Sequence, residues 1–253
     1  MLEVRDVHLS FGGIKALQGI SFAARAGEIT GVIGPNGAGK TSLFNAISGF
    51  YRPDRGKVLF DGRDITALAP DRRAALGIAR TFQNIALFRG MTVLDNIKLG
   101  AHVRLHTGLW AALGYFGPAR REEIALRRQI EDKVIDFLEI DHIRKYPITI
   151  LPYGLQKRVE LGRALAMQPK VLLLDEPVAG MNREKTADMA RFILDVQEQF
   201  GTTILLVEHD MSLVMDICSH IVVLNFGQQI AEGAPAQVSG DAAVVEAYLG
   251  AAA

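Results

Sequence analysis

Residues 34–42 read Gly-Pro-Asn-Gly-Ala-Gly-Lys-Thr-Ser and directly follow the apolar segment 28–33. This order predicts a strand, a glycine-rich turn and then a helix. Gly37 and Gly39 allow the backbone to curve inward, so that several N–H groups point at one set of phosphate oxygens. The positive end of the helix dipole would face the same place. The stretch therefore predicts a phosphate-binding loop.

Two side chains of this loop have distinct chemical roles. Lys40 supplies a positive charge for the β and γ phosphates, and Thr41 supplies a hydroxyl that can ligate Mg²⁺. We predict that the whole loop contacts the nucleotide through Gly34, Pro35, Asn36, Gly37, Ala38, Gly39, Lys40, Thr41 and Ser42. ATP and Mg²⁺ are the expected cofactors.

Composition limits the classes of function. The chain has 253 residues, of which 49% are hydrophobic, so it can bury a large core. Its 28 basic and 28 acidic residues cancel, which argues against sequence-independent nucleic-acid binding. The single cysteine, Cys218, is expected in the core, and its isolation suits a reducing cytosol. No apolar run approaches the roughly 20 residues that cross a bilayer, so work at a membrane would be done from its surface.

The remaining pattern predicts an α/β fold. Short β-like runs at 2–9, 20–24 and 56–59 predict an antiparallel lead-in. Further strands are expected at 171–174, 202–207 and 220–224, with helices at 185–200 and 211–219 between them. Strands that alternate with helices indicate a parallel sheet covered on both faces. From about 71 to 146 the pattern turns helical, which we interpret as a helical insertion.

A pair of carboxylates follows the apolar strand 171–174. Asp175 is expected to hold Mg²⁺, and Glu176 to orient or deprotonate a water that attacks the γ-phosphate. A strand that ends in Asp-Glu is common, but here it follows a complete phosphate loop. Parallel sheets present ligands at the carboxyl ends of their strands, which is where these residues lie.

Histidines give weaker signals. The strand 202–207 ends in Glu208-His209-Asp210, so His209 could contact the γ-phosphate or the attacking water. A single histidine after a strand is more often structural. His102 and His106 have the i, i+4 spacing of a metal pair, but no clear third ligand accompanies them, and a surface position is the better interpretation.

A second helix start could also bind an anion. The segment 151–165 reads Leu-Pro-Tyr-Gly-Leu-Gln-Lys-Arg-Val-Glu-Leu-Gly-Arg-Ala-Leu, a turn that opens an amphipathic helix. The chain already has one predicted phosphate site. A second helix start that can bind an anion is consistent with two chains that share nucleotides between them. An ordinary capped helix remains open.

Taken together, GPNGAGKTS, LPYGLQKRVELGRAL, VLLLDEP and LLVEHDM resemble, in this order, the ATP-binding subunits of ABC transporters over nearly the whole chain. The stretches LSFGG, VAGMN, EHDMSLVM, the insertion 100–121 and the AYLG ending resemble the branched-chain amino acid importer group. The resemblance implies a P-loop NTPase (RecA-like) parallel-sheet core with an antiparallel β lead-in and an inserted α-helical subdomain. One ABC domain would span 1–253, with its core at about 1–82 and 168–253 and the helical subdomain at about 83–167.

The resemblance also assigns roles to residues. It makes Phe11 the aromatic that stacks on adenine, Gln83 a loop residue that meets Mg²⁺ and relays to the membrane subunit, Glu176 the catalytic carboxylate and His209 the switch histidine. The signature that closes over the partner chain's nucleotide corresponds to Leu151, Pro152, Tyr153, Gly154, Leu155 and Gln156. Two ATPs would then lie at a head-to-tail dimer interface.

The signature departs from the commonest ABC pattern. Pro152 stands where a serine usually gives a hydroxyl to the γ-phosphate, and Tyr153 and Leu155 replace the usual Gly and Gln. Asn182 occupies a place where many ABC proteins have Asp, although asparagine is what the branched-chain group has there. We expect the missing hydroxyl to weaken the signature contact and lower turnover.

The leading hypothesis is an ATPase subunit that drives import of branched-chain or hydrophobic amino acids. Expected partners are a second copy or a related ATPase subunit, transmembrane permease subunits and, indirectly, a solute-binding protein, at the cytoplasmic face of the inner membrane. The alternatives are other cargo (urea, amides, other amino acids, exported lipid), a soluble ABC ATPase of DNA repair or translation, and a metabolic kinase.

The apolar run 109–116 is interpreted as core packing, with a permease or lipid contact as the alternative.

Overall fold

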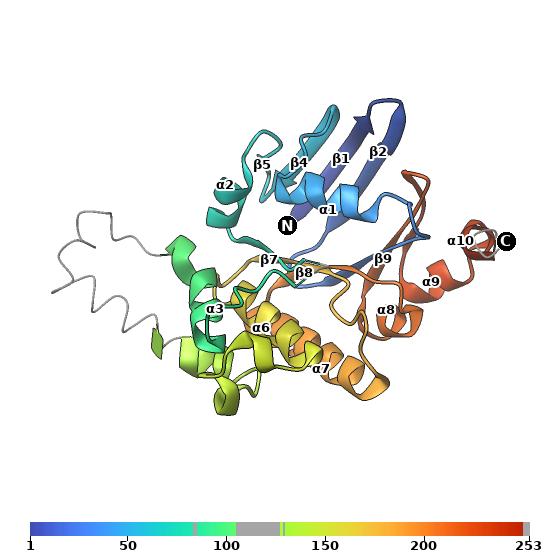
Figure 1. Ribbon diagram of the computed structural model, residues 1–253. Helices are drawn as coiled ribbons and strands as arrows, with labels where there is room; N and C mark the ends of the chain where they lie inside the picture. Colours follow the sequence, from blue (N-terminus) through green and yellow to red (C-terminus); the bar gives the residue numbers. More distant parts are fainter. Residues whose placement is uncertain (83–84, 105–126, 129, 250–253) are drawn as a thin grey trace. The chain divides into compact units, whose positions relative to one another are not determined.

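The computed structural model describes residues 1–82, 85–104, 127, 128 and 130–249. The chain divides into two compact units. The first contains Met1–Gln83 and Lys170–Ala253, and the second contains Asn84–Pro169. Figure 1 traces the elements along the chain.

The first unit begins with an antiparallel sheet in the order β2-β1-β4-β5. Strand β1 (Leu2–Phe11) pairs with β2 (Ile14–Ala24) on one side and with β4 (Arg55–Phe60) on the other. Strand β5 (Arg63–Asp64) closes the edge. The sequence predicted this antiparallel lead-in, but β2 starts at Ile14 rather than near residue 20, because pairing with β1 extends the strand back to the Gly12-Gly13 turn.

A six-stranded sheet forms the rest of this unit, in the order β10-β9-β3-β8-β7-β6. Strands β9, β3, β8, β7 and β6 run parallel, and only β10 pairs antiparallel to its neighbour. The strands are β3 (Ile29–Ile33), β6 (Ile78–Arg80), β7 (Val171–Asp175), β8 (Thr203–Val207), β9 (His220–Asn225) and β10 (Gln228–Gly233). The predicted parallel sheet is confirmed.

The register of the parallel strands brings three strand ends to one edge. Val32 of β3 lies beside Val207 of β8, and Val207 lies beside Asp175 of β7. All five residues of β3, β7 and β8 are buried in each strand, as expected for a sheet covered on both faces. The loops that follow Ile33, Asp175 and Val207 therefore start side by side.

Helix α1 (Lys40–Ser48) packs into a core that both sheets share. Leu43, Phe44 and Ile47 of α1 are completely buried, and the same core holds residues of β1, β2, β4, β7, β8 and β9. Burial of large apolar side chains stabilises the fold by about 1.5–3 kcal/mol each. The phosphate loop is thus joined to a helix that has little freedom to move.

Among its described residues, the first unit has five further helices: α2 (Pro70–Ala75), α7 (Arg183–Phe200), α8 (Met211–Ile217), α9 (Pro235–Ser239) and α10 (Ala242–Leu249). Asn182 accepts a hydrogen bond from the backbone N–H of Lys185, and Asp210 accepts one from that of Leu213. These side chains cap α7 and α8, which explains why each helix starts at the residue that follows its capping side chain.

In the described part of the second unit, the named elements are helices joined by irregular segments. Helix α3 (Val93–Gly100) packs against α6 (Tyr153–Leu165). A Cβ at Gly100 would lie 1.8 Å from the carbonyl oxygen of Arg163, so glycine is required for this close approach. The shorter helical segments are Ala101–Arg104, Glu131–Ile135, Asp141–Ile143 and Ile148–Ile150.

The structure corrects one expectation and contains one strand for which the sequence analysis made no prediction. Residues 78–80 form strand β6, whereas the sequence pattern placed them in a helical region that began near 71. Three residues are too few to show a strand period, and pairing with β7 decides their conformation. Strand β10 was not predicted either, because Gln228, Gln229 and Glu232 make it polar; it forms as the antiparallel edge beside β9.

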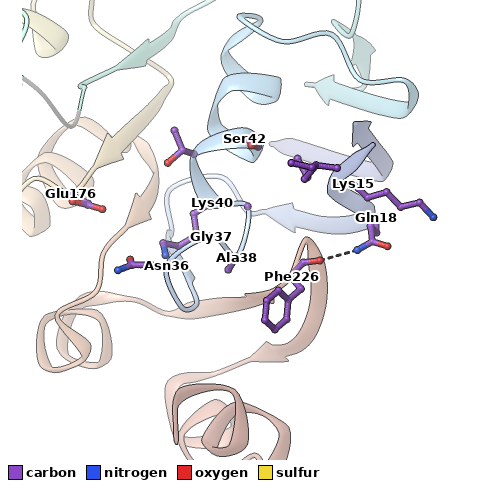
Figure 2. Close-up of a pocket in the computed structure, with 13 residues that line it drawn as sticks. Lys15, Gln18, Asn36, Gly37, Ala38, Lys40, Ser42, Glu176 and Phe226 are labelled. Carbon is purple, nitrogen blue, oxygen red and sulfur yellow. Dashed lines mark hydrogen bonds between the residues drawn. The ribbon is translucent and has the colours of Figure 1, made fainter. Parts of the chain in front are cut away.

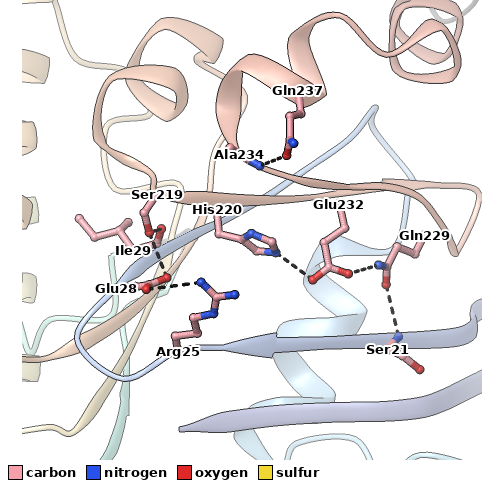
Figure 3. Close-up of polar contacts among 10 residues, drawn as sticks. All are labelled: Ser21, Arg25, Glu28, Ile29, Ser219, His220, Gln229, Glu232, Ala234 and Gln237. Carbon is pink, nitrogen blue, oxygen red and sulfur yellow. Dashed lines mark hydrogen bonds and ion pairs between the residues drawn. The ribbon is translucent and has the colours of Figure 1, made fainter.

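A chain of polar contacts joins the two sheets at the surface (Figure 3). The backbone N–H of Ser21 in β2 donates to Gln229 Oε1 in β10 at 3.3 Å, and Gln229 Nε2 donates to Glu232 Oε2 at 2.7 Å. His220 Nε2 of β9 lies 2.8 Å from Glu232 Oε1. The unpredicted strand β10 therefore connects the antiparallel sheet to the parallel one.

Among the described residues, none of the helices combines the length and the apolar character required to cross a bilayer. The apolar run 109–116, interpreted above as core packing, lies outside the described residues.

Candidate nucleotide site

The phosphate loop leaves β3 and enters α1 through three glycines with positive φ. Gly34, Gly37 and Gly39 have φ of 148°, 79° and 104°. A Cβ on Gly34 would lie 2.0 Å from the carbonyl oxygen of Leu224, and one on Gly39 would lie 2.6 Å from that of Ala16. The loop therefore takes a conformation that only glycine tolerates at these two positions.

Lys40 closes this loop on itself. Its Nζ donates hydrogen bonds to the carbonyl oxygens of Gly34 at 2.6 Å and Pro35 at 3.0 Å. Burial lowers the pKa of Lys40, while the negative charges of Glu176 and Asp175 act in the opposite direction. The first turn of α1 carries no side-chain cap, so its N-terminal N–H groups remain suited to an anion.

A pocket of about 620 Å³ opens over this loop. Figure 2 shows Asn36, Gly37, Ala38 and Lys40 along the loop, with Glu176 to one side and Phe226 beneath Ala38. The pocket is lined by Ile14, Lys15, Ala16, Gln18, Asn36, Gly37, Ala38, Gly39, Lys40, Thr41, Ser42, Glu176 and Phe226. Seven of the nine loop residues predicted from the sequence thus line one pocket together with the predicted catalytic carboxylate.

The turn between β9 and β10 is hydrogen-bonded to the phosphate loop. The backbone N–H of Gly227 donates to the carbonyl oxygen of Ala38 at 3.0 Å, and Gln18 Nε2 donates to that of Phe226 at 2.8 Å. Phe226 has φ 45° and a side chain that is largely exposed at the pocket wall. Sequence reasoning missed Phe226, and its only signal was an aromatic residue before a glycine in a turn.

Asp175 and Glu176 differ sharply in their surroundings. Asp175 ends β7, is 2% exposed and accepts a hydrogen bond from Arg80 NH2 at 2.8 Å. Glu176 has φ 49°, and its backbone N–H donates to the carbonyl oxygen of Val207 at 2.9 Å. The left-handed backbone of Glu176 breaks the strand geometry, so its side chain lines the pocket while Asp175 stays buried.

The end of β8 holds the remaining predicted catalytic group. The His209 side chain is 62% exposed, and its Nδ1 lies 3.9 Å from Glu208 Oε2. Glu208 is fully buried, and its carboxylate accepts hydrogen bonds from the backbone N–H groups of Val178 and His209 at 3.0 and 3.1 Å. Burial raises the pKa of Glu208. Glu208 therefore fixes the loop after Glu176 to the strand end that carries His209, a role that the sequence did not reveal.

Other predicted residues lie elsewhere. Phe11, at the end of β1, is half-exposed and packs edge-on against Tyr51 with ring centroids 5.0 Å apart. It is not one of the residues that line the described pocket. Gln83 lies outside the described residues. His102 is described and exposed, His106 is not described, and the described residues contain no cluster of three or more metal-binding side chains.

The predicted signature belongs to the second unit. Pro152 precedes the first residue of α6, with φ −56° and ψ 150°, and no side chain caps this helix. Gln156 Nε2 donates to the carbonyl oxygen of Leu151 at 2.8 Å, which holds the turn against the helix. Leu151 is buried, Tyr153 is exposed, and Gly154 and Leu155 are partly exposed. The helix N-terminus predicted as an anion-binding end is present.

Comparison with known proteins decides the family. The sequence model described as ABC transporter matches residues 17–179, which span the phosphate loop, the signature and the Asp-Glu pair. The chain belongs to the ABC transporter family. A second model, described as branched-chain amino acid ATP-binding cassette transporter, matches residues 228–253. The predicted family and fold class are confirmed, and the chain is an ATPase subunit.

Two of the curated relatives illustrate the match, which extends over nearly the whole chain. The high-affinity branched-chain amino acid transport ATP-binding protein BraF of Pseudomonas aeruginosa is 38% identical, covering 99% of this chain and 98% of that protein. The high-affinity branched-chain amino acid transport ATP-binding protein LivG of Escherichia coli is also 38% identical, covering 99% of this chain and 98% of that protein. The ADP conformation of MJ1267, an ATP-binding cassette of an ABC transporter, superposes with a TM-score of 0.85 at 35% identity, covering 99% of this chain and 98% of that one.

Proposed function

We propose that this ABC ATPase powers the import of branched-chain amino acids through a separate membrane permease. One observation carries the proposal: a single chain combines the phosphate-loop pocket that Glu176 lines with a C-terminal segment, 228–253, that matches the branched-chain transporter model. The names of the full-length relatives support the same cargo.

ATP is bound by charge and by backbone N–H groups. Lys40 exchanges its contacts with Gly34 and Pro35 for the β and γ phosphates, and the uncapped first turn of α1 faces the same anion. Phe11 stacks on the adenine after it moves from its contact with Tyr51.

Magnesium suits the oxygen donors at this strand edge. The hydroxyl of Thr41 and the carboxylate of Asp175 are hard oxygen ligands, and Asp175 is a buried anion whose field reaches Lys40. Thr41 and Asp175 would hold the ion, with Gln83 as a further ligand. When bound, Mg²⁺ neutralises the charge of the transferring phosphate.

Glu176 is the catalytic base. Its carboxylate lines the pocket and can accept a proton from the water that attacks the γ-phosphate. His209 lies at the end of the neighbouring strand β8, with an exposed ring that can contact the same phosphate. Both groups stand at strand ends that the sheet register aligns.

Two copies of the ATPase act together. In this proposal the signature helix start of one copy, from Leu151 to Gln156, closes over the nucleotide that the phosphate loop of the other copy holds. ATP binding closes the dimer, and hydrolysis reopens it. The pair works peripherally on the cytoplasmic face of the inner membrane, bound to permease subunits that receive cargo from a solute-binding protein.

Glu176→Gln tests the catalytic assignment. The variant should keep its ATP affinity, lose hydrolysis by about 10²–10⁴-fold and accumulate as an ATP-bound dimer, because only proton transfer is removed. Nucleotide binding, phosphate release and size-exclusion chromatography measure these three properties against the wild type. Undiminished phosphate release by Glu176→Gln would contradict the role of this carboxylate.

Transport tests the cargo. The ATPase is reconstituted in vesicles with permease subunits and a solute-binding protein, and the uptake of labelled leucine, urea and a short amide is compared. ATP-dependent uptake of leucine supports the proposal. Uptake of urea or the amide without leucine would assign a different cargo.

A further inference from the structure

Arg80 forms a buried ion pair with the strand-end carboxylate. Its NH2 lies 2.8 Å from Asp175 Oδ2, and the two side chains are 8% and 3% exposed. Arg80 ends β6 and Asp175 ends β7, and these strands are direct neighbours in the sheet. The contact is therefore set by the sheet itself and does not depend on a loop.

The other side of the guanidinium is tied to helix α1. Arg80 NH1 donates to Asn45 Oδ1 at 2.6 Å and to Ser48 Oγ at 2.9 Å. Ser48 can accept this bond because its own hydroxyl donates to the carbonyl oxygen of Phe44 at 2.6 Å. The planar group thus bridges the phosphate-loop helix and the carboxylate strand, a task that suits its rigid fork of donors.

Aromatic rings surround the same guanidinium. Its central carbon lies 5.7, 5.9 and 5.3 Å from the ring centroids of Phe44, Phe50 and Phe82. Such rings attract a cation and exclude water, which strengthens the ion pair that faces Asp175. Arg80 is therefore held on several sides, with NH1 bonded to α1 and NH2 bonded to the carboxylate.

Arg80 occupies only one oxygen of Asp175. A carboxylate has two oxygens, and the bond from Arg80 to Oδ2 fixes the direction in which Oδ1 points. The backbone N–H of Asp175 donates to Thr81 Oγ1 at 3.3 Å, which restrains the same residue from the main chain. Groups that orient a metal ligand in this way influence metal affinity strongly.

We propose that Arg80 is a positioning residue for magnesium: it orients Asp175 and couples this carboxylate to the phosphate-loop helix α1 through Asn45 and Ser48. The inference rests on the proposed function, which assigns Asp175 to the Mg²⁺ of bound ATP. Stability alone does not explain this ion pair, because a buried ion pair often stabilises a protein no more than apolar residues of the same size would.

The test separates metal binding from nucleotide binding. The full chain carrying Arg80→Met is compared with the wild type for ATP affinity in EDTA, and for the affinity of the ATP complex for Mn²⁺, followed by electron paramagnetic resonance. We expect the Mn²⁺ affinity to fall by about 10- to 100-fold while ATP affinity in EDTA changes little. Arg80→Lys should recover part of the loss, since it keeps the charge without the fork.

Arg73→Met is the matched control. Arg73 is another buried arginine beside α1, but its NH1 donates to the carbonyl oxygens of Ala46 and Ile47, both at 2.7 Å. Its removal should lower the melting temperature and leave the Mn²⁺ affinity unchanged.

Should Arg80→Met fail to fold, Ser48→Ala loosens the Arg80 guanidinium without removing its charge, and a smaller fall in Mn²⁺ affinity is expected.

Two results would overturn the inference. One is an unchanged Mn²⁺ affinity in both Arg80→Met and Ser48→Ala. The other is a parallel loss of ATP affinity in EDTA and of Mn²⁺ affinity, as for a general structural defect. A wild-type chain that binds ATP but no Mn²⁺ would instead defeat the proposed metal site itself, and the two failures are therefore distinguishable.

Discussion

At the scale of single residues, the site depends on a few charged groups that the fold holds in unequal environments. Lys40 is partly buried and bonded to backbone carbonyls, Asp175 is buried against Arg80, and Glu176 lines the open pocket. Adjacent carboxylates are thereby separated into one that is buried and paired with Arg80 and one that lines the pocket. The left-handed backbone of Glu176 makes this separation possible.

Lys40→Ala should weaken ATP binding by at least about tenfold, because a charge-assisted hydrogen bond to phosphate is lost. The carbonyl oxygens of Gly34 and Pro35 also lose their donor, which loosens the loop. Calorimetric titration with ATP measures the effect. Lys15→Ala is the control, since Lys15 lines the same pocket from β2; an equal loss in both variants would refute a special role for Lys40.

Pro152→Ser should raise ATPase turnover. The serine hydroxyl supplies the contact to the γ-phosphate that proline lacks, at the residue that precedes α6. It also offers a cap to the first turn of a helix that has none, a change of about 0.5–2 kcal/mol in helix stability. Steady-state phosphate release is compared in the two proteins at equal dimer concentration. Equal or lower turnover in Pro152→Ser would count against the proposed contact.

At the scale of elements, the phosphate loop is shaped by the strand ends around it. The loop packs on the carbonyl oxygen of Leu224 at the end of β9, and the β9–β10 turn bonds to Ala38. The loop sequence alone predicts a phosphate site, but these neighbours decide which of its glycines are irreplaceable. Substitution of single glycines can show the difference.

Gly34→Ala should destabilise the protein more than Gly37→Ala. Both positions have positive φ, which costs an alanine about 1–2 kcal/mol. A Cβ at Gly34 would also collide with Leu224 O at 2.0 Å, whereas a Cβ at Gly37 meets nothing within 4 Å. Urea denaturation of the two variants gives the comparison, and equal free energies of unfolding would show that β9 does not restrain the loop.

At the scale of the whole molecule, the first unit is built around a continuous apolar core that joins its two sheets. Cys218 lies in this unit, is 6% exposed and has a pKa raised by burial to about 12. The interpretation of Cys218 as a core residue is confirmed. Chemical labelling of this thiol therefore measures whether the first unit is folded.

Native protein at pH 8 should react with iodoacetamide about a thousandfold more slowly than the urea-unfolded chain. At this pH a thiol of pKa about 12 is almost entirely protonated, whereas one near 8.5 is about one-quarter thiolate. Mass spectrometry follows the single label over a urea series. Rapid labelling of the folded chain would place Cys218 outside the core.

The sequence by itself determined the family, the phosphate loop, the parallel strands and the Asp175-Glu176 pair. The loop, the strands and the carboxylate pair are encoded locally, by residue types at short spacing, so that backbone freedom and hydrophobic pattern reveal them. The family follows instead from the resemblance of several motifs spread along the whole chain. Tertiary structure alone decided that residues 78–80 form a strand, that Glu208 anchors the loop after Glu176, and that Arg80 faces Asp175. Arg80 and Asp175 are 95 residues apart, and their contact arises because β6 and β7 pair side by side, a neighbour relation that local sequence does not carry.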